Sequence, residues 1–98
     1  MAIGPVDRFR EFLRRKNASL TAEREAVVKA VFSESSYFDV EQWIDAPTGD
    51  RASMSPSRST VYRTLYLMQD AGLISLVTRI PDHRIFAQLI FGTDIEVE

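Results

Sequence analysis

The sequence predicts an α+β fold, mostly helical, in which four helices are followed by a two-stranded β-hairpin. Apolar residues recur at helical spacing in four segments before Gly72. Two apolar runs, residues 74–80 and 85–91, then flank the turn-forming sequence PDHR at 81–84. The chain has 98 residues, a length that suits one domain.

The first two helices have recognisable start and stop signals. Pro5 occupies a favoured first position, and Asn17 tolerates the left-handed conformation that ends a helix. Thr21 is placed to cap the second helix, because Glu23 and Glu25 follow in a first turn where the helix dipole favours anions. The residues expected to face the core are Val6, Phe9, Phe12, Leu13, Val27, Ala30 and Val31.

A third, short helix is expected to begin at Asp39. Gln42 stands three residues later, which is the spacing of a capping box. Phe38 and Trp43 are placed to pack across that cap as a hydrophobic staple. Tyr37 and Phe38 are expected to form a brief strand just before it.

The fourth helix follows a loop, residues 47–56, that is rich in proline, glycine and serine. Ser57 is its expected cap, Gly72 its stop, and Leu73 can fold back on Met68. The helix is expected to run to Ala71, with a core face made of Val61, Thr64, Leu65, Met68 and Ala71.

Helices in this order, followed by a hairpin, predict a winged helix-turn-helix with one extra helix in front. We expect this domain to occupy residues 1–92. Residues 93–98 are expected to be a tail or the start of a further domain.

The composition limits the function classes. The net charge of −2 argues mildly against nucleic acid, but basic residues gather early in the chain and around the fourth helix. The absence of cysteine excludes disulfides and thiolate metal sites. The sequence offers neither a paired base and nucleophile nor a glycine-rich phosphate loop, so nothing in it indicates an enzyme. Without a predicted membrane span or signal peptide, the expected location is the cytoplasm.

The outer face of the fourth helix carries groups that suit a DNA groove. Ser59, Tyr62, Arg63, Tyr66 and Asp70 fall opposite the core face. Arginine can grip guanine, hydroxyls can bond bases or phosphates, and a tyrosine ring can press on a thymine methyl. A purely solubilising face would be expected to carry glutamate and lysine instead. The alternative is an exposed amphipathic helix with incidental tyrosines.

Basic side chains outside this helix are candidates for phosphate contacts. Arg14, Arg15 and Arg24 could bond the DNA backbone, or they could simply solvate a helix face. Arg79 and Arg84 flank the hairpin turn, where a wing would meet phosphate or the minor groove, although a charged turn is equally ordinary. The predicted DNA-contacting residues are Arg14, Arg15, Arg24, Ser57, Arg58, Ser59, Thr60, Tyr62, Arg63, Tyr66, Arg79 and Arg84.

Several of these motifs resemble a known family. Residues 59–65 (STVYRTL) and 70–74 (DAGLI) are similar to the recognition helix of the ferric uptake regulator family. Residues 20–24 (LTAER) resemble the opening of its second helix, and 40–44 (VEQWI) resemble its third. The hairpin after these motifs sits where the family has its wing. The resemblance covers about residues 8–90.

The resemblance implies roles for individual residues. Tyr62 and Arg63 would contact bases and nearby backbone, and Arg24 would hold a phosphate. Family members tend to carry a basic residue where this chain has Ser19, so the matching minor-groove contact is not expected there. Arg14 or Arg15 would have to replace it.

The family also has a dimerisation domain, rich in histidine and cysteine, that binds zinc and a regulatory metal. This chain stops where that domain would begin, and its one histidine, His83, matches no family ligand. Tyr37 or Phe38, and Ala87 with Gln88, stand where members often have a histidine and a glutamate. We therefore expect no cofactor and no metal in this chain. It is either the DNA-binding portion of a longer regulator or a short relative that has lost metal sensing.

The leading hypothesis is a transcription regulator domain that binds duplex DNA sequence-specifically, as a homodimer on a two-part site. The alternative is a winged-helix module that binds another protein through Tyr62, Tyr66 and Leu67, since fold alone does not settle function.

Overall fold

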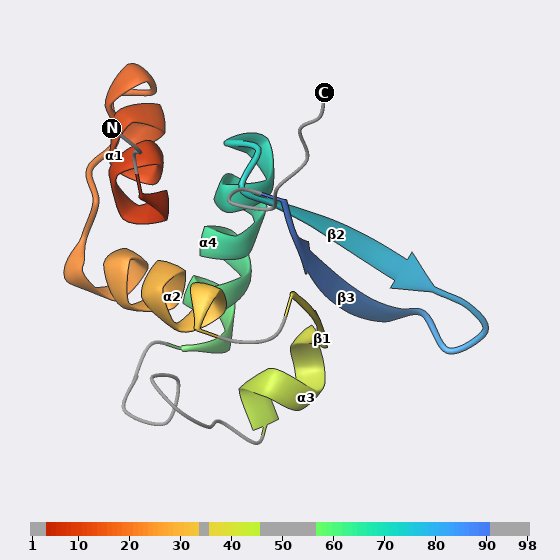
Figure 1. The fold of residues 1–98 in the computed structure, drawn as a ribbon. Coiled ribbons are helices and arrows are strands. Elements are labelled where there is room, and N and C mark those ends of the chain that lie inside the picture. The colour runs from red at the N-terminus through yellow and green to blue at the C-terminus, as the bar shows by residue number, and fades with distance from the viewer. Residues whose placement is uncertain (1–3, 34–35, 46–56, 91–98) are drawn as a thin grey trace, which may run out of the picture.

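The structure, a computed structural model, describes residues 4–33, 36–45 and 57–90. Its mixed, mostly helical architecture confirms the predicted fold class (Figure 1). The predicted loop at 47–56 and the predicted tail at 93–98 lie outside the described residues. In chain order the elements are α1 (Pro5–Arg15), α2 (Ala22–Phe32), β1 (Tyr37–Asp39), α3 (Val40–Asp45), α4 (Arg58–Asp70), β2 (Ile74–Arg79) and β3 (Arg84–Leu89).

The sheet has three antiparallel strands in the order β1-β3-β2. The brief strand expected at Tyr37 is therefore present, but the wing is larger than the two-stranded hairpin predicted. Phe38 of β1 and Leu76 of β2 both pair with Ala87 of β3. Because Phe38 is 9% exposed and Ala87 is fully buried, this pairing joins the base of the wing to the core.

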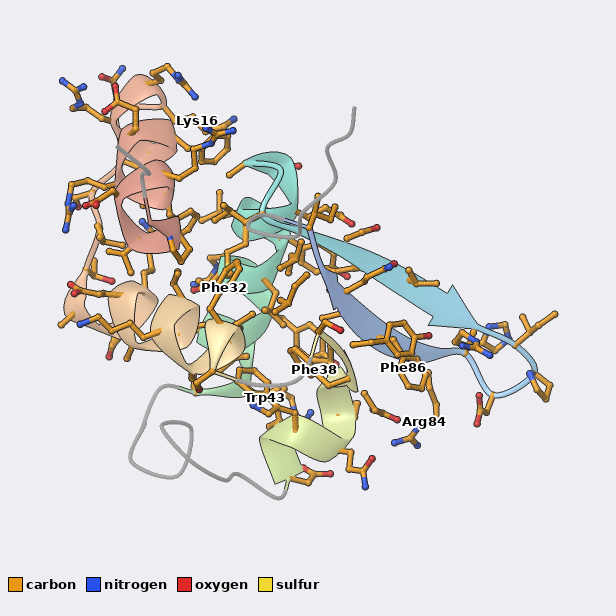
Figure 2. All side chains as sticks on the ribbon, in the orientation of Figure 1. Lys16, Phe32, Phe38, Trp43, Arg84 and Phe86 are labelled. Carbon is orange, nitrogen blue, oxygen red and sulfur yellow. The ribbon has the colours of Figure 1, made fainter. Side chains whose placement is uncertain are left out.

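Side-chain caps begin three of the helices, as predicted. Thr21 Oγ1 accepts from the backbone N–H of Arg24 at 3.1 Å, and Ser57 Oγ accepts from that of Thr60 at 3.2 Å. Asp39 Oδ1 accepts from the N–H of Gln42 at 3.2 Å, which fixes the start of the short helix α3. The expected staple is also present, because the Phe38 and Trp43 rings lie 5.2 Å apart between centroids (Figure 2).

Left-handed residues end α1 and α4. Asn17 has φ of 58° and Gly72 has φ of 81°. Behind Gly72, the backbone N–H of Leu73 returns to the carbonyl of Met68 at 3.0 Å, so the predicted fold-back is confirmed. The helix itself ends at Asp70, one residue before the predicted Ala71.

Each strand of the hairpin is one residue shorter than predicted, and β3 runs from Arg84 to Leu89 instead of over the expected range 85–91. β2 ends at Arg79 rather than residue 80, and β3 begins at Arg84 rather than residue 85. Arg79 and Arg84 are paired across the strands, so both belong to the sheet rather than to the turn. In Figure 1 the hairpin projects away from the helices.

The core lies between α1, α2, α4 and the base of the sheet. Val28 was not among the expected core residues, but it is fully buried beside Val27, because α2 packs against both α1 and α4. Thr64 is 1% exposed, and its hydroxyl is satisfied by donating to the Thr60 carbonyl at 2.8 Å. Across the described ranges, no helix combines the length and hydrophobicity that crossing a membrane requires.

Candidate nucleic-acid interface

Helix α4 has one buried face and one exposed face. Val61, Thr64, Leu65 and Met68 are buried against the core. The opposite face is solvent-exposed, with Tyr66 at 50% exposure. The exposed residues of α4 and its cap are Ser57, Arg58, Ser59, Arg63, Tyr66 and Asp70. Four of the five residues predicted for the outer face are therefore exposed, whereas Tyr62 is half-buried.

On the side of α4 next to α3, two predicted DNA-contacting residues already have partners. Tyr62 is half-buried, and its hydroxyl donates to Glu41 Oε2. Arg58 donates from Nη1 to Glu41 Oε1 and from Nη2 to Asp45 Oδ1, the latter at 3.3 Å. Tyr62 and Arg58 therefore lie against acidic groups of α3, whereas Arg63 and Tyr66 face solvent.

The Glu41 cluster also changes how these groups ionise. The hydrogen bond from Tyr62, followed by that from Arg58, lowers the pKa of the Glu41 carboxyl below its usual value. Burial, followed by the hydrogen bond to the Glu41 carboxylate, raises the pKa of the Tyr62 hydroxyl far above its usual value. Glu41 is thus ionised and Tyr62 remains a neutral donor at physiological pH.

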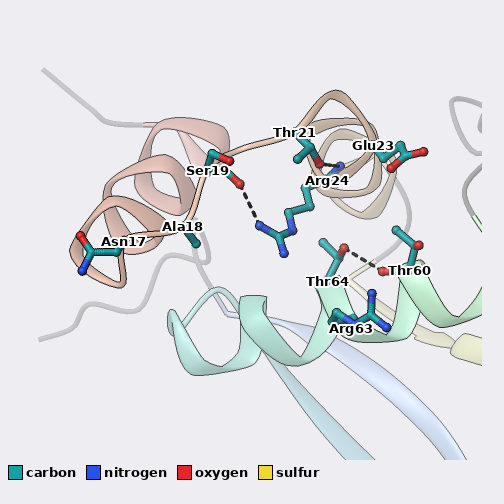
Figure 3. A pocket seen from close by; sticks show the side chains of 9 residues that line it. All are labelled: Asn17, Ala18, Ser19, Thr21, Glu23, Arg24, Thr60, Arg63 and Thr64. Atoms are coloured by element: carbon teal, nitrogen blue, oxygen red, sulfur yellow. Dashed lines mark hydrogen bonds between the residues drawn. The ribbon is translucent and has the colours of Figure 1, made fainter.

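On the other side of α4, a cleft of about 400 Å³ separates it from the loop before α2 and the first turn of α2. Figure 3 shows the Arg24 side chain reaching from α2 across this space, with Arg63 on α4 opposite it. Arg24 Nη1 donates to the Ser19 carbonyl at 2.8 Å. Arg63 makes no ion pair with any described residue. The cleft therefore brings together two of the predicted arginines, and Thr60 is a third predicted contact that lines it.

The arginines of α1 lie elsewhere. Arg14 donates to Glu11 at 2.6 Å on the exposed face of α1. Arg15 lines a separate hollow together with Ala71, the C-cap residue that follows α4. Since a helix rises about 1.5 Å per residue, the 13 residues of α4 place Arg15 roughly 20 Å along the axis from the capped end. The structure does not group Arg14 and Arg15 with the other predicted contacts.

The two arginines of the wing, Arg79 and Arg84, both hydrogen-bond to residues of β1. Arg79 Nη1 donates to the Tyr37 hydroxyl at 2.7 Å, and its guanidinium lies 5.6 Å from the centre of the Phe86 ring. Arg84 donates from Nε to Asp39, and Figure 2 shows its side chain between β3 and α3. They flank the hairpin turn as predicted, as cross-strand partners, and the neighbouring Ile80 is 80% exposed.

The prediction missed the acidic residues that hold these cations: Asp39, Glu41 and Asp45. A signal for part of the set was present in the spacing. Glu41 and Asp45 are four residues apart on α3, and Arg58 and Tyr62 are four apart on α4, so each pair shares one helix face. Two such complementary faces on neighbouring helices indicate a contact.

A comparison with known families adds an independent observation. The sequence model described as Ferric uptake regulator family matches residues 15–89, well over half of the chain.

The chain belongs to the ferric uptake regulator family.

This match confirms the resemblance drawn from the motifs in α2, α3 and α4. Neither the search of curated proteins nor the search of solved structures found a match. Ferric uptake regulators are regulatory proteins rather than enzymes, which supports a regulatory role for this chain.

The metal sites associated with ferric uptake regulators need several donor side chains close together. Within residues 4–33, 36–45 and 57–90, no three or more histidine, cysteine, aspartate or glutamate side chains come close enough together to hold a metal ion. His83 lies in the hairpin turn with φ of 57°. The described residues therefore do not fit such a site, which needs about four ligands for zinc.

Proposed function

We propose that this ferric uptake regulator domain binds duplex DNA in a sequence-specific manner, with α4 in the major groove. The observation that carries the proposal is that the face of α4 opposite the core is exposed to solvent and carries a positive charge. Arg63 and Tyr66 face solvent opposite the core, and Arg24 reaches the same side of the molecule across the cleft from α2. A helix presented in this way, with arginine and hydroxyl groups at its start, has the chemistry that base edges and phosphates recognise.

The proposal assigns different work to different groups. Arg63 would read a base, because a free guanidinium can bond guanine at two points. Tyr62 and Tyr66 would contact thymine methyl groups and nearby backbone. Arg24 would bond a phosphate and position the domain without reading sequence. The capped end of α4, residues 57–60, would direct hydroxyl and backbone N–H groups at a phosphate.

Arg58, Arg79 and Arg84 can take part only with the donors they have left. A guanidinium has five N–H donors, so an arginine that gives one or two to a protein partner can still donate to phosphate. Arg14 and Arg15 would serve only if the DNA reached toward the far end of α4.

A homodimer on a two-part site is part of the proposal. One domain of this size offers few contacts, and linked half-sites raise the affinity without any new contact. The half-sites would lie about one helical turn of DNA apart, or a multiple of it. Such a regulator would act in the cytoplasm, where it meets the DNA.

The test begins with selection of bound sequences from a random duplex library, followed by titration of a selected and a scrambled duplex at several salt concentrations. We expect the selected duplex to bind more tightly at every salt concentration. Affinity for both should fall steeply with salt, with a log–log slope of about −0.9 per phosphate contact. A failure to enrich any sequence would contradict the proposal.

A protein-binding role is the second candidate. It is favoured by the acidic partners that already neutralise Arg58 and Arg84. The patch expected for this role is smaller than predicted, because Leu67 and Tyr62 are both partly buried against the core. The pair formed by Tyr62 and Tyr66, with ring centroids 6.5 Å apart, remains. Loss of a protein partner in Tyr66→Ala, with DNA binding intact, would favour this role.

A further inference from the structure

Among the residues that the structure describes, Glu41 is the one acidic residue that bonds two of the predicted DNA-contacting side chains. Its two carboxylate oxygens are divided between them, Oε1 accepting from Arg58 and Oε2 from Tyr62. Asp45, one turn further along α3, holds the other terminal nitrogen of Arg58. Helix α3 thus fixes the position of both side chains at one edge of α4.

A contribution to folding stability does not explain why Glu41 contacts Arg58 and Tyr62. The Glu41 side chain is 39% exposed and that of Arg58 is 50% exposed. Ion pairs this accessible to water contribute little to folding, because solvent screens them and two long side chains lose freedom. The main effect of the contacts is to fix the direction of the Arg58 guanidinium and of the hydroxyl of Tyr62, whose ring also packs against the core.

The position of Tyr62 also affects Tyr66, the most exposed aromatic ring of α4. The Tyr62 ring lies against that of Tyr66, with centroids 6.5 Å apart and planes inclined by 31°. Tyr66 is 50% exposed and makes up much of the apolar surface that α4 presents. A Tyr62 ring that is free to turn would leave Tyr66 without this support.

The negative charge of the Glu41 carboxylate also repels the phosphates of any DNA bound at α4. Glu41 is in direct contact with two residues assigned to the interface, so its negative charge lies well within the screening length of about 8–10 Å of any phosphate bound there. This repulsion depends on the DNA backbone and is the same for every sequence. Orientation of the rings, by contrast, matters only where a particular base is read.

We propose that Glu41 is a positioning residue of the DNA interface, which holds Tyr62 and Arg58 ready for base reading and weakens binding to DNA of every sequence. This inference rests on the proposed function. It assigns to α3 a part in selectivity, although α3 itself carries none of the predicted DNA contacts.

The test compares Glu41→Ala and Glu41→Gln with the wild-type chain on a selected duplex and on a scrambled one. Glu41→Ala removes both the charge and the acceptors, so binding to the scrambled duplex should strengthen and the preference for the selected duplex should fall by about fivefold. Glu41→Gln keeps one carbonyl acceptor for Tyr62 and loses the charge. It should bind both duplexes more tightly and recover most of the preference.

Glu25→Gln is the matched control. Glu25 is 36% exposed and pairs with Lys29 at 3.1 Å, so the substitution also removes one negative charge from an exposed ion pair, at a site with no predicted DNA contact. It should leave the preference unchanged. Thermal melting of each variant checks that the fold is intact.

A second measurement needs no DNA. Nuclear Overhauser contacts between the Tyr62 and Tyr66 rings should be strong in the wild type and in Glu41→Gln, and weaker in Glu41→Ala. If the wild type shows a sequence preference and Glu41→Ala keeps both the preference and the ring contacts, the positioning role is wrong while the proposed function stands. If the wild type shows no preference, both fall.

Discussion

Asp39 joins the wing to α3 by using its two carboxylate oxygens for different partners. Oδ1 accepts from the backbone N–H of Gln42 at 3.2 Å and caps α3. Oδ2 accepts from Arg84 on β3, 45 positions further along the chain. The Asp39 side chain is only 9% exposed, whereas that of Arg84 is 44% exposed. One residue therefore sets both the start of α3 and the position of the wing beside it.

The first prediction concerns this residue and pH. Burial opposes ionisation of Asp39, but the hydrogen bonds from Arg84 and from the N–H of Gln42 outweigh it, so its pKa lies below the usual value. A depressed folded-state pKa adds stability above the unfolded value of about 3.9 and loses it as pH falls further. The free energy of unfolding, measured in urea, should therefore decline as pH falls from about 5 to 3.

Asp39→Ala should remove part of that decline and destabilise the domain at pH 7 by about 1–2 kcal/mol, since both the cap and the contact to Arg84 are lost. Asp45→Ala is the control, because Asp45 is 67% exposed and should contribute little. Equal losses from the two substitutions would contradict the role given to Asp39.

The second prediction concerns the end of α4. Gly72 has φ of 81°, and a Cβ at this position would meet nothing within 4 Å. Gly72→Ala should therefore destabilise through backbone strain alone, by about 1 kcal/mol. Gly72→Asn should lose less, because asparagine tolerates this conformation. If urea unfolding gave the two variants the same stability as the wild type, this would contradict the left-handed conformation of Gly72 at the end of α4.

Local signals of this kind were readable from the sequence. Thr21, Ser57 and Asn17 each act on backbone groups within five residues, and the energy of such a contact depends on residue type and spacing alone. The buried face of α4 was readable for the same reason, because helical spacing decides which side chains share a face.

Contacts between distant segments were not readable in this way. The hydrogen bond from Arg84 to Asp39 and the one from Arg79 to Tyr37 join residues 45 and 42 positions apart. They exist because β1 adds to the hairpin as a third strand, in a register set by Phe38 against Ala87. The sequence predicted that two arginines would flank the turn of the wing. Only the three-stranded sheet shows that both arginines hydrogen-bond to residues of β1.

The third prediction concerns Arg24. Arg24→Ala should weaken binding to selected and scrambled duplexes by the same factor, because a phosphate contact carries no sequence information. The salt slope should become shallower by about one unit. Lys29→Ala also removes one positive charge from α2, but Lys29 does not line the cleft, so it should change the slope less. A selective loss on the selected duplex would assign Arg24 to base reading instead.

The fourth prediction concerns the wing. Arg79→Ala should weaken binding to every duplex without changing the preference, since we assign the guanidinium held beside Tyr37 and Phe86 to a phosphate contact, which carries no sequence information. Tyr37→Phe removes the hydroxyl that accepts from Arg79 but keeps the ring that stacks on Phe86 at 5.1 Å. Its affinity, measured by fluorescence anisotropy, should stay within about twofold of the wild type, as for an exposed neutral contact. No effect of Arg79→Ala would remove the wing from the interface.

The central claim is that an exposed guanidinium on α4 reads a base, and Arg63→Ala tests it most directly. Titrated with the selected duplex, Arg63→Ala should lose about 1–3 kcal/mol of binding free energy, and it should lose much less with the scrambled duplex. Arg10→Ala is the matched control, because it removes an arginine from α1 that pairs with Asp7 at 2.8 Å and lies outside the predicted contacts. If the two variants lost equal affinity on both duplexes, α4 would not be the helix that reads DNA.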